Sequence, residues 1–298
     1  MHFVIGLGMT VLELLNWSTD HLEHHRIENP RLNAELLLAC SLSVSREVLY
    51  VHLQDQLKEK EQERFEDLIN RRMAGEPLQY ILGHQEFWSI DLTVNPRVLI
   101  PRPETELLVE QALLILSERP LERTPSVLEI GTGSGAVAIS LAKEVRNIFL
   151  VATDISRNAL MVAKENAKAA GVIGPIEFVN GSLFTPFHPL REEERFDLIL
   201  SNPPYVDHSE IQRLPKEVRD YEPIIALDGG KDGLEIYHSL IKQVPSCLKK
   251  GGWLLLEVGQ GQGEEVSEQL ERSGFFLKPQ LLQDLSGIGR VVKAQRTG

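Results

Sequence analysis

The sequence predicts an α/β protein built on a doubly wound, mostly parallel sheet. From Ser126 onward, short apolar runs with the length of buried strands alternate with stretches that have helical spacing. The first of these runs ends in a glycine-rich turn, residues 131–135, and later runs end at Asp154 and Asn202. In open sheets of this kind, ligands bind in the crevice beyond the carboxyl ends of the strands, so these turns are the first candidates for a site.

The N-terminal quarter of the chain has a different pattern. From about Thr10 to Ala74, apolar residues recur three and four positions apart, and polar breaks divide the pattern into separate helices. We predict a small helical bundle over residues 1–76. The first eight residues, MHFVIGLG, precede this pattern, and we expect a disordered tail or an alternative translation start there.

The pattern changes again over residues 77–100. Alternating apolar residues, punctuated by glycine and an Asn-Pro pair, predict a β-hairpin linker between two domains. The loop that follows, residues 101–106, contains two prolines that stiffen it, and a helix is expected from there to Leu116. Residues 101–298 are expected to form the second domain.

The elements of the second domain follow from apolar runs that are bounded by glycine, proline and acidic residues. The predicted strands are residues 127–130, 148–153, 176–179, 196–200 and 252–258, with two final strands at 275–282 and 290–294. The predicted helices are residues 136–142, 156–170 and 234–248. Ser156 is the expected N-cap of the second helix. Strands that alternate with helices in this way pair mostly in parallel.

The charge and the apolar runs exclude several kinds of protein. A formal net charge of −12 argues against broad contact with a phosphate backbone, which requires clustered lysine and arginine. An acidic chain can favour a basic protein partner instead. No apolar run approaches the roughly 18–20 residues that span a bilayer, and the apolar N-terminus is too short for a signal peptide. We therefore expect a soluble protein that does not bind membranes.

The cysteines indicate the compartment. Cys40 and Cys247 are the only two, and they lie far apart in the sequence. This spacing fits neither a disulfide framework nor a zinc site, so we expect no metal. The reducing cytoplasm is the expected location.

The first motif with chemical meaning is the turn after the first predicted strand, Gly131-Thr132-Gly133-Ser134-Gly135. Glycine at a strand-to-helix turn adopts φ values that other residues avoid, and it lets the backbone approach a ligand closely. A tight turn without a ligand is one interpretation. A dinucleotide site is another, because Gly131, Gly133 and Ala136 also fit the pattern G-x-G-x-x-A.

The second element is Asp154, at the end of the next predicted strand. That position lies beside the glycine turn in an open α/β sheet, where a carboxylate can accept hydrogen bonds from both hydroxyls of a ribose. The alternative is a favourable negative charge near the N-terminus of the helix capped by Ser156. Dinucleotide and adenosylmethionine sites share such a carboxylate, so Asp154 does not distinguish them.

The third motif, Asn202-Pro203-Pro204-Tyr205, separates these possibilities. It follows the fourth predicted strand, at the same edge of the sheet. An amide nitrogen is a poor nucleophile because its lone pair is delocalised into the carbonyl. The Asn202 side-chain oxygen and the Pro203 carbonyl could each accept a hydrogen bond from one N–H group of such an amide. These hydrogen bonds would return electron density to the nitrogen and point its lone pair along the line of methyl transfer. Tyr205 would pack against the planar group. A rigid loop without a ligand is the alternative.

These motifs in this order resemble those of the amino-methyltransferases, which act on exocyclic nitrogens of nucleobases or on glutamine amides. The longer context resembles one family, the peptide chain release factor glutamine methyltransferases. That resemblance covers nearly the whole chain from about residue 10. The segments that resemble the family most specifically are Glu86-Phe87-Trp88, residues 99–106, residues 201–205, Tyr221-Glu222-Pro223, Ala226-Leu227, and Asp284-Leu285-Ser286-Gly287 with Arg290.

The resemblance implies a Rossmann-like, seven-stranded class I methyltransferase domain over residues 101–298, behind the hairpin linker at 77–100. It implies that the helical domain, residues 1–76, recognises the substrate. The implied reaction transfers a methyl group from S-adenosyl-L-methionine to the side-chain N5 of the glutamine in the Gly-Gly-Gln motif of release factors. The implied partners are the release factors, with no nucleic-acid substrate.

The resemblance also assigns roles to single residues. The methionine part of the cofactor would lie against Gly131, Thr132, Gly133, Ser134 and Gly135. Asp154 would hold its ribose and Leu183 would lie by its adenine, with Asn202 also beside the cofactor. The glutamine would be gripped by Asn202, Pro203, Pro204 and Tyr205. Ser182 departs from the family, which usually has aspartate there, so a hydroxyl or a backbone amide is expected to replace that carboxylate.

Several alternatives remain open at this point. A sister glutamine methyltransferase would modify a ribosomal protein, and its specificity would lie in the N-terminal helices. A nucleic-acid amino-methyltransferase is disfavoured by the acidic charge. A binding module without activity is disfavoured by the intact motifs. Arg102 and Glu104 are interpreted as residues that order their loop, with a surface ion pair as the alternative.

Overall fold

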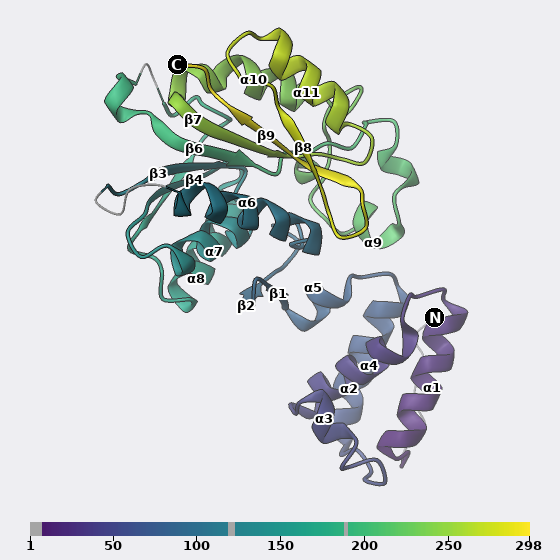
Figure 1. Ribbon diagram of the computed structural model, residues 1–298. Coiled ribbons are helices and arrows are strands. Elements are labelled where there is room, and N and C mark those ends of the chain that lie inside the picture. Colours follow the sequence, from purple (N-terminus) through teal and green to yellow (C-terminus); the bar gives the residue numbers. More distant parts are fainter. Residues whose placement is uncertain (1–7, 119–122, 188–189) are drawn as a thin grey trace. The chain divides into compact units, whose positions relative to one another are not determined.

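The computed structural model describes residues 8–118, 123–187 and 190–298. The chain divides into two compact units (Figure 1). One contains the residues up to Gly83 together with Pro215–Tyr221, and the other contains His84–Leu214 and Glu222–Gly298. Of the eight residues expected to form a tail, residues 1–7 lie outside the described part of the chain.

The first unit is helical. Its helices are α1 (Val11–His24), α2 (Pro30–Leu42), α3 (Arg46–Leu49), α4 (Glu59–Met73), α5 (Leu78–Leu82) and α9 (Lys216–Arg219). A capping box begins α1, because the Thr10 side chain accepts from the Glu13 amide while the Glu13 carboxylate accepts from the Thr10 amide. Leu14, Leu37 and other fully buried aliphatic residues of α1, α2 and α4 form its core.

Helix α9 packs in this unit although it comes from a distant part of the sequence. The guanidinium of Arg72, which is 5% exposed, donates to Asn33 Oδ1 at 2.8 Å and pairs with Glu217 at 2.8 Å. The Tyr221 hydroxyl donates to the Ala74 carbonyl at 3.4 Å. A buried cation needs such partners to offset its lost hydration, so Arg72 ties α9 to α2 and α4.

The second unit begins with a hairpin of β1 (His84–Phe87) and β2 (Ile90–Thr93). Trp88 and Ser89 form its turn with positive φ angles of 51° and 55°. The buried Asn166 accepts from the Thr93 amide at 2.9 Å and donates to its carbonyl at 3.0 Å, which holds the hairpin against α8 (Arg157–Ala169). A short helix, α5, occupies the start of the segment where the sequence predicts only strands.

The main sheet of the second unit has seven strands in the order β5-β4-β3-β6-β7-β9-β8. They are β3 (Ser126–Ile130), β4 (Phe149–Asp154), β5 (Ile176–Asn180), β6 (Phe196–Ser201), β7 (Leu248–Glu257), β8 (Gln280–Gln283) and β9 (Gly289–Gln295). The first five in this order pair in parallel, and β9 is antiparallel to both β7 and β8. The predicted α/β sheet is confirmed, and it contains one reversed strand.

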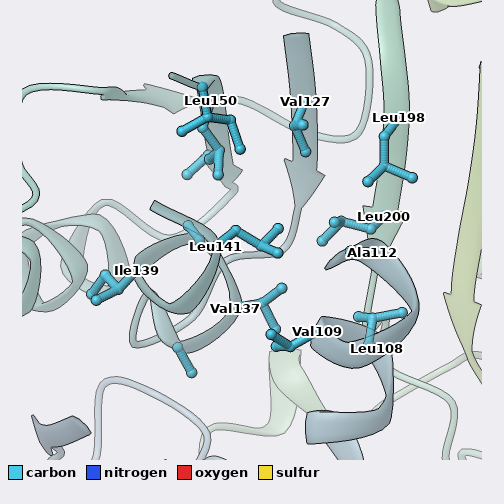
Figure 2. Packing of buried hydrophobic residues seen from close by; sticks show 14 of the residues in the cluster. Leu108, Val109, Ala112, Val127, Val137, Ile139, Leu141, Leu150, Leu198 and Leu200 are labelled. Atoms are coloured by element: carbon cyan, nitrogen blue, oxygen red, sulfur yellow. The ribbon is translucent and has the colours of Figure 1, made fainter. Parts of the chain in front are cut away.

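Helices cover both faces of this sheet (Figure 1). One face carries α6 (Glu106–Ser117), α7 (Ala136–Glu144) and α8, and the other carries α10 (Glu235–Cys247) and α11 (Gly263–Arg272). Val127 packs in the first of these layers, as Figure 2 shows, whereas its neighbour Leu128 packs in the second. Because both faces are buried, the central strands are continuous apolar runs.

Short 3₁₀ turns complete the unit at η1 (Pro103–Thr105), η2 (Glu192–Glu194), η3 (Ile211–Arg213) and η4 (Ile224–Ala226). Helix α11 was not predicted from the sequence, because its apolar face rests on few residues, chiefly Val266 and Leu270. Among the described helices, none combines the length and the apolar character needed to cross a membrane.

Candidate active site

Strand register brings the three motifs together. In the parallel pairs, Ile130 of β3 lies opposite Thr153 of β4 on one side and opposite Ser201 of β6 on the other. The glycine turn, Asp154 and Asn202 therefore leave the sheet at the same edge. This edge is also the topological switch point, because β4 and β6 leave β3 in opposite directions, and a crevice opens there.

A cavity of about 610 Å³ occupies this crevice. Residues of all three motifs line it, namely Gly131, Thr132, Gly133, Ser134, Asp154, Asn202, Pro203 and Pro204, and so do Ser182 and Leu183. Gly135 and Tyr205 are not among its lining residues. The volume is in the range of small-molecule and cofactor sites.

The glycine turn has positive φ angles at Gly131 (77°), Gly133 (56°) and Gly135 (85°). The amides of Gly131 and Thr132 both donate to the Thr153 carbonyl, at 2.9 and 2.8 Å, so the turn is tied to β4. A Cβ at Gly135 would lie 2.9 Å from Ile139 Cδ1 and 3.1 Å from Ala163 Cβ. Gly135 therefore serves the close packing of helices α7 and α8.

Asp154 is fixed by two backbone amides. Its Oδ2 accepts from Gly133 N at 2.9 Å and its Oδ1 accepts from Ser156 N at 2.8 Å. Burial raises the pKa of Asp154, and the hydrogen bonds from the Ser156 and Gly133 amides oppose this rise. Each carboxylate oxygen keeps a second acceptor site that a ligand in the cavity can use. The Ser156 hydroxyl caps α8 by accepting from Ala159 N at 3.2 Å.

Glu129 is a site residue to which the sequence interpretation assigned no role. It lines the cavity, is 3% exposed, and accepts from the Thr132 hydroxyl at 2.6 Å. Burial raises the pKa of the Glu129 carboxyl to about 7, and the nearby Asp154 also raises it, while the Thr132 hydrogen bond lowers it. An acidic residue inside an apolar strand was the signal in the sequence that could have pointed to it.

Asn202 begins the third motif at the carboxyl end of β6. Its Nδ2 donates to the Thr105 hydroxyl at 3.1 Å, and a Cβ on Gly131 would lie 3.8 Å from the Asn202 carbonyl oxygen. The backbone of this motif thus runs directly beside the glycine turn. The Ser201 hydroxyl, which donates to the Ile130 carbonyl at 2.7 Å, fixes the ends of β3 and β6 relative to each other.

The segment after Asn202 is also held. Gln262 donates to the Tyr205 carbonyl at 2.9 Å, and a Cβ at Gly233 would lie only 2.4 Å from that oxygen. Burial raises the pKa of the Tyr205 phenol to about 12, so it stays neutral near physiological pH. Its ring packs partly against the apolar layer that contains α10 and α11.

The loop that contains Ser182 and Leu183 forms another wall. Leu183 has a positive φ of 49°, which is strained for a leucine, and it lines the cavity. The Thr185 hydroxyl accepts from Ser182 N at 3.2 Å and donates to its carbonyl at 2.8 Å, which stabilises this turn. Ser182 also lines the cavity, at the position where the resembling family usually has aspartate.

Arg102 takes part in an ion pair with a buried partner. Its guanidinium lies 2.5 Å from Glu222 Oε1, and the Glu222 side chain is 1% exposed. Glu222 Oε2 also accepts from the Ile100 amide at 3.3 Å. This pair joins the loop before α6 to the segment that begins at Pro223 and lines the cavity, whereas Glu104 is exposed.

The comparisons with known proteins agree with this geometry. The PrmC N-terminal domain matches residues 13–83 and the Methyltransferase small domain matches residues 105–218. A human methyltransferase 10 domain containing protein superposes with a TM-score of 0.53 at 15% identity, covering 70% of this chain and 88% of that chain. The order of the sheet, its one reversed strand and the site at the switch point are those of the class I methyltransferase fold.

Curated relatives narrow this class to one family. The "Release factor glutamine methyltransferase" of Geobacter sulfurreducens is 42% identical over 95% of this chain and 95% of its own length. That of Koribacter versatilis is 41% identical over 97% of this chain and 99% of its own length. The chain belongs to the release factor glutamine methyltransferase family.

Proposed function

We propose that this protein transfers a methyl group from S-adenosyl-L-methionine to the side-chain N5 of the glutamine in the Gly-Gly-Gln motif of peptide chain release factors. One observation carries the proposal. The Asn202 motif lines the same cavity as the glycine turn and Asp154. Residues suited to bind a carboxamide therefore face the same cavity as residues suited to bind a nucleoside. The release factor glutamine methyltransferases that are 41% and 42% identical to this chain support release factors as the substrate.

The residues present fit the methyl donor. Asp154 keeps acceptor sites for the two ribose hydroxyls, and Glu129 places a carboxyl where a cationic ligand can pair with it. Leu183 supplies an apolar wall for the adenine, and Ser182 replaces a carboxylate with a hydroxyl. When bound, this cofactor supplies a methyl group attached to a positively charged sulfonium.

Asn202 and Pro203 would act on the substrate amide. The Asn202 Oδ1 and the Pro203 carbonyl accept from the two N–H groups of the glutamine, which turns the nitrogen lone pair toward the methyl carbon. The cofactor, held by the glycine turn and Asp154, would supply the methyl group, and the glutamine nitrogen that accepts it would lose one proton to solvent. Pro204 lines the cavity, whereas Tyr205 does not, and the neutral Tyr205 ring would support the loop from the apolar layer that contains α10 and α11.

The net charge and the cysteines support the rest of the proposal. The charge of −12 favours a basic protein surface and disfavours a nucleic-acid substrate. Cys40 and Cys247 are both free thiols, as expected for a protein that works in the cytoplasm. We propose no metal and no membrane partner.

The proposal predicts a single modification. Purified protein incubated with methyl-labelled S-adenosylmethionine and a release factor should place one methyl on the glutamine of the Gly-Gly-Gln motif, as peptide mass spectrometry can locate. A release factor with that glutamine replaced by alanine is the control and should stay unlabelled. Label on nucleic acid, or on a ribosomal protein alone, would overturn the assignment of the substrate.

We expect cofactor binding to depend on pH because Glu129 ionises near neutral pH. Burial holds the pKa of Glu129 at about 7, and a cationic ligand favours the ionised carboxylate, so binding lowers this pKa. Affinity should therefore approach its maximum well above pH 7 and should fall roughly fivefold to tenfold between pH 7.5 and pH 6. Titration calorimetry measures this, with uptake of the released proton by the buffer as a second readout.

The Glu129→Gln variant is the matched control, because it keeps the side-chain volume and cannot ionise. Its cofactor affinity should be lower at pH 7.5 and nearly constant between pH 6 and pH 7.5. A native pH dependence that persists unchanged in this variant would assign the effect to another group, such as Asp154, whose pKa is also raised by burial.

A further inference from the structure

We propose that Thr105 and Glu257 are positioning residues that hold the Asn202 carboxamide with its oxygen toward the substrate. The inference rests on the proposed function, in which that oxygen accepts from the glutamine amide. A carboxamide has an oxygen and an NH₂ group of nearly equal size, so the loop alone does not determine which one faces the cavity. Only when the Asn202 oxygen faces the cavity can this side chain accept a hydrogen bond from the substrate amide.

Three elements bring these side chains together. Ser201 of β6 pairs with Leu256 of β7, so the next residues, Asn202 and Glu257, leave the two strands side by side. Thr105 ends η1, and its hydroxyl accepts from Asn202 Nδ2 at 3.1 Å. Thr105 is 5% exposed and Glu257 is 2% exposed. Thr105 and Asn202 line the cavity, whereas Glu257 is not among its lining residues, so Glu257 would act through the other two.

The direction of the hydrogen bonds determines the orientation. Asn202 Nδ2 donates to the Thr105 hydroxyl at 3.1 Å, and both side chains lie close enough to the Glu257 carboxyl to lower its pKa. An ionised carboxylate only accepts hydrogen bonds, so we infer that the Thr105 hydroxyl points its O–H toward Glu257 and that the Asn202 NH₂ faces the same side. In the flipped orientation, the Asn202 oxygen would meet the lone pairs of Thr105 and Glu257.

The second carboxylate oxygen strengthens this preference. Glu257 Oε2 is buried and has no hydrogen-bond partner in the described part of the chain. A buried acceptor without a donor is costly, and a second acceptor placed beside it would raise that cost. The pocket around Glu257 therefore selects the NH₂ of Asn202 and excludes its oxygen.

The ionisation of Glu257 should control the orientation of the Asn202 carboxamide. Burial, with a smaller contribution from Glu104, raises the pKa of the Glu257 carboxyl to about 7 against the opposing effects of Thr105, Arg290 and Asn202. The phenols of Tyr205 and Tyr237 are the other titratable groups that interact with it, and both stay neutral because burial raises their pKa values. Above pH 7 the Glu257 carboxylate is ionised and can only accept hydrogen bonds, so it favours donors beside it. Below pH 7 the protonated carboxyl can itself donate, so the preference weakens.

The experiment compares Thr105→Val, Thr105→Ser and Glu257→Gln with the native enzyme, at saturating cofactor and with a release factor as substrate. Thr105→Val keeps the shape and loses the hydroxyl, so kcat should fall by between about tenfold and a hundredfold. Thr105→Ser restores the hydroxyl and should restore kcat. Glu257→Gln should lower kcat similarly and remove its decline below pH 7. Cofactor affinity should stay within about twofold in all three.

A matched control is Ser140→Ala in α7, which removes a buried hydroxyl that donates to the Ala136 carbonyl at 2.7 Å outside the cavity lining. It should keep native kcat and measures the general cost of losing such a bond. If Glu257→Gln does not fold, the Thr105 pair and the native pH profile decide the question.

The outcomes separate this inference from the function beneath it. If Asn202→Ala is inactive while Thr105→Val keeps native kcat and a native pH profile, the positioning role is wrong and the proposed function stands. If Asn202→Ala retains native activity, the role of the Asn202 motif itself fails. Loss of kcat in Thr105→Val without recovery in Thr105→Ser would also overturn the inference, because the hydroxyl would not be the cause.

Discussion

Replacing Asn202 with alanine is expected to slow methyl transfer by about a hundredfold to a thousandfold. The reason is that the substituted loop keeps its backbone but loses the side-chain acceptor that would activate and orient the glutamine amide. The Pro203 carbonyl remains, so some rate above background should persist. Single-turnover kinetics with labelled cofactor and excess release factor measure the chemical step directly.

The affinity for S-adenosylmethionine should be nearly unchanged in the same variant. The Asn202 side chain is engaged with Thr105, whereas the glycine turn and Asp154 are held by β4 and α8 independently of it. Calorimetry measures the affinity for the cofactor, and thermal unfolding checks that the variant is folded. Loss of cofactor binding in a folded Asn202→Ala protein would show that the division of roles between the two motifs is wrong.

Replacing Asp154 with asparagine is expected to weaken cofactor binding by about a hundredfold, with a rate loss that follows from it. The carboxylate accepts from the Gly133 and Ser156 amides through different oxygens. Asparagine has one oxygen, so its NH₂ would face one of these N–H groups, and the turn or the side chain must move. One of the two oxygens that would accept from the ribose hydroxyls is lost as well.

Asp284→Asn is the matched control for this prediction. Asp284 also accepts from two backbone amides, Ser286 N at 2.8 Å and Ile288 N at 3.0 Å, but it does not line the cavity. Its substitution should leave cofactor affinity within about twofold of native. Equal losses in both variants would point to a general cost in stability, and the ribose role of Asp154 would then be contradicted.

The elements of the second unit were predictable to within a few residues wherever an apolar run ended at a turn residue. Strand β3, predicted at residues 127–130, spans Ser126–Ile130, and β4, predicted at 148–153, spans Phe149–Asp154. Strand β8 is shorter than the predicted 275–282, because the pairing with β9 begins only at Gln280. Helix α11 escaped prediction because its sequence is mostly polar.

The sequence by itself determined the order of the motifs, since a glycine turn, an acidic residue and Asn-Pro-Pro-Tyr follow successive apolar strands. That order is local information: each motif is set by turn chemistry and burial within a few residues. The fold class, and the resemblance to a methyltransferase family, both follow from it.

Only the tertiary structure decided which residues share the site. An acidic residue in an apolar strand marks Glu129 and Glu257 as unusual, but which residues they meet depends on strand order and on the register of β3, β6 and β7. Thr105 has no such mark in the sequence. Gly135 does not line the cavity, and the packing of α7 against α8 explains its presence. Long-range pairing determines such neighbours, because residues far apart in sequence meet only after the sheet has chosen its order.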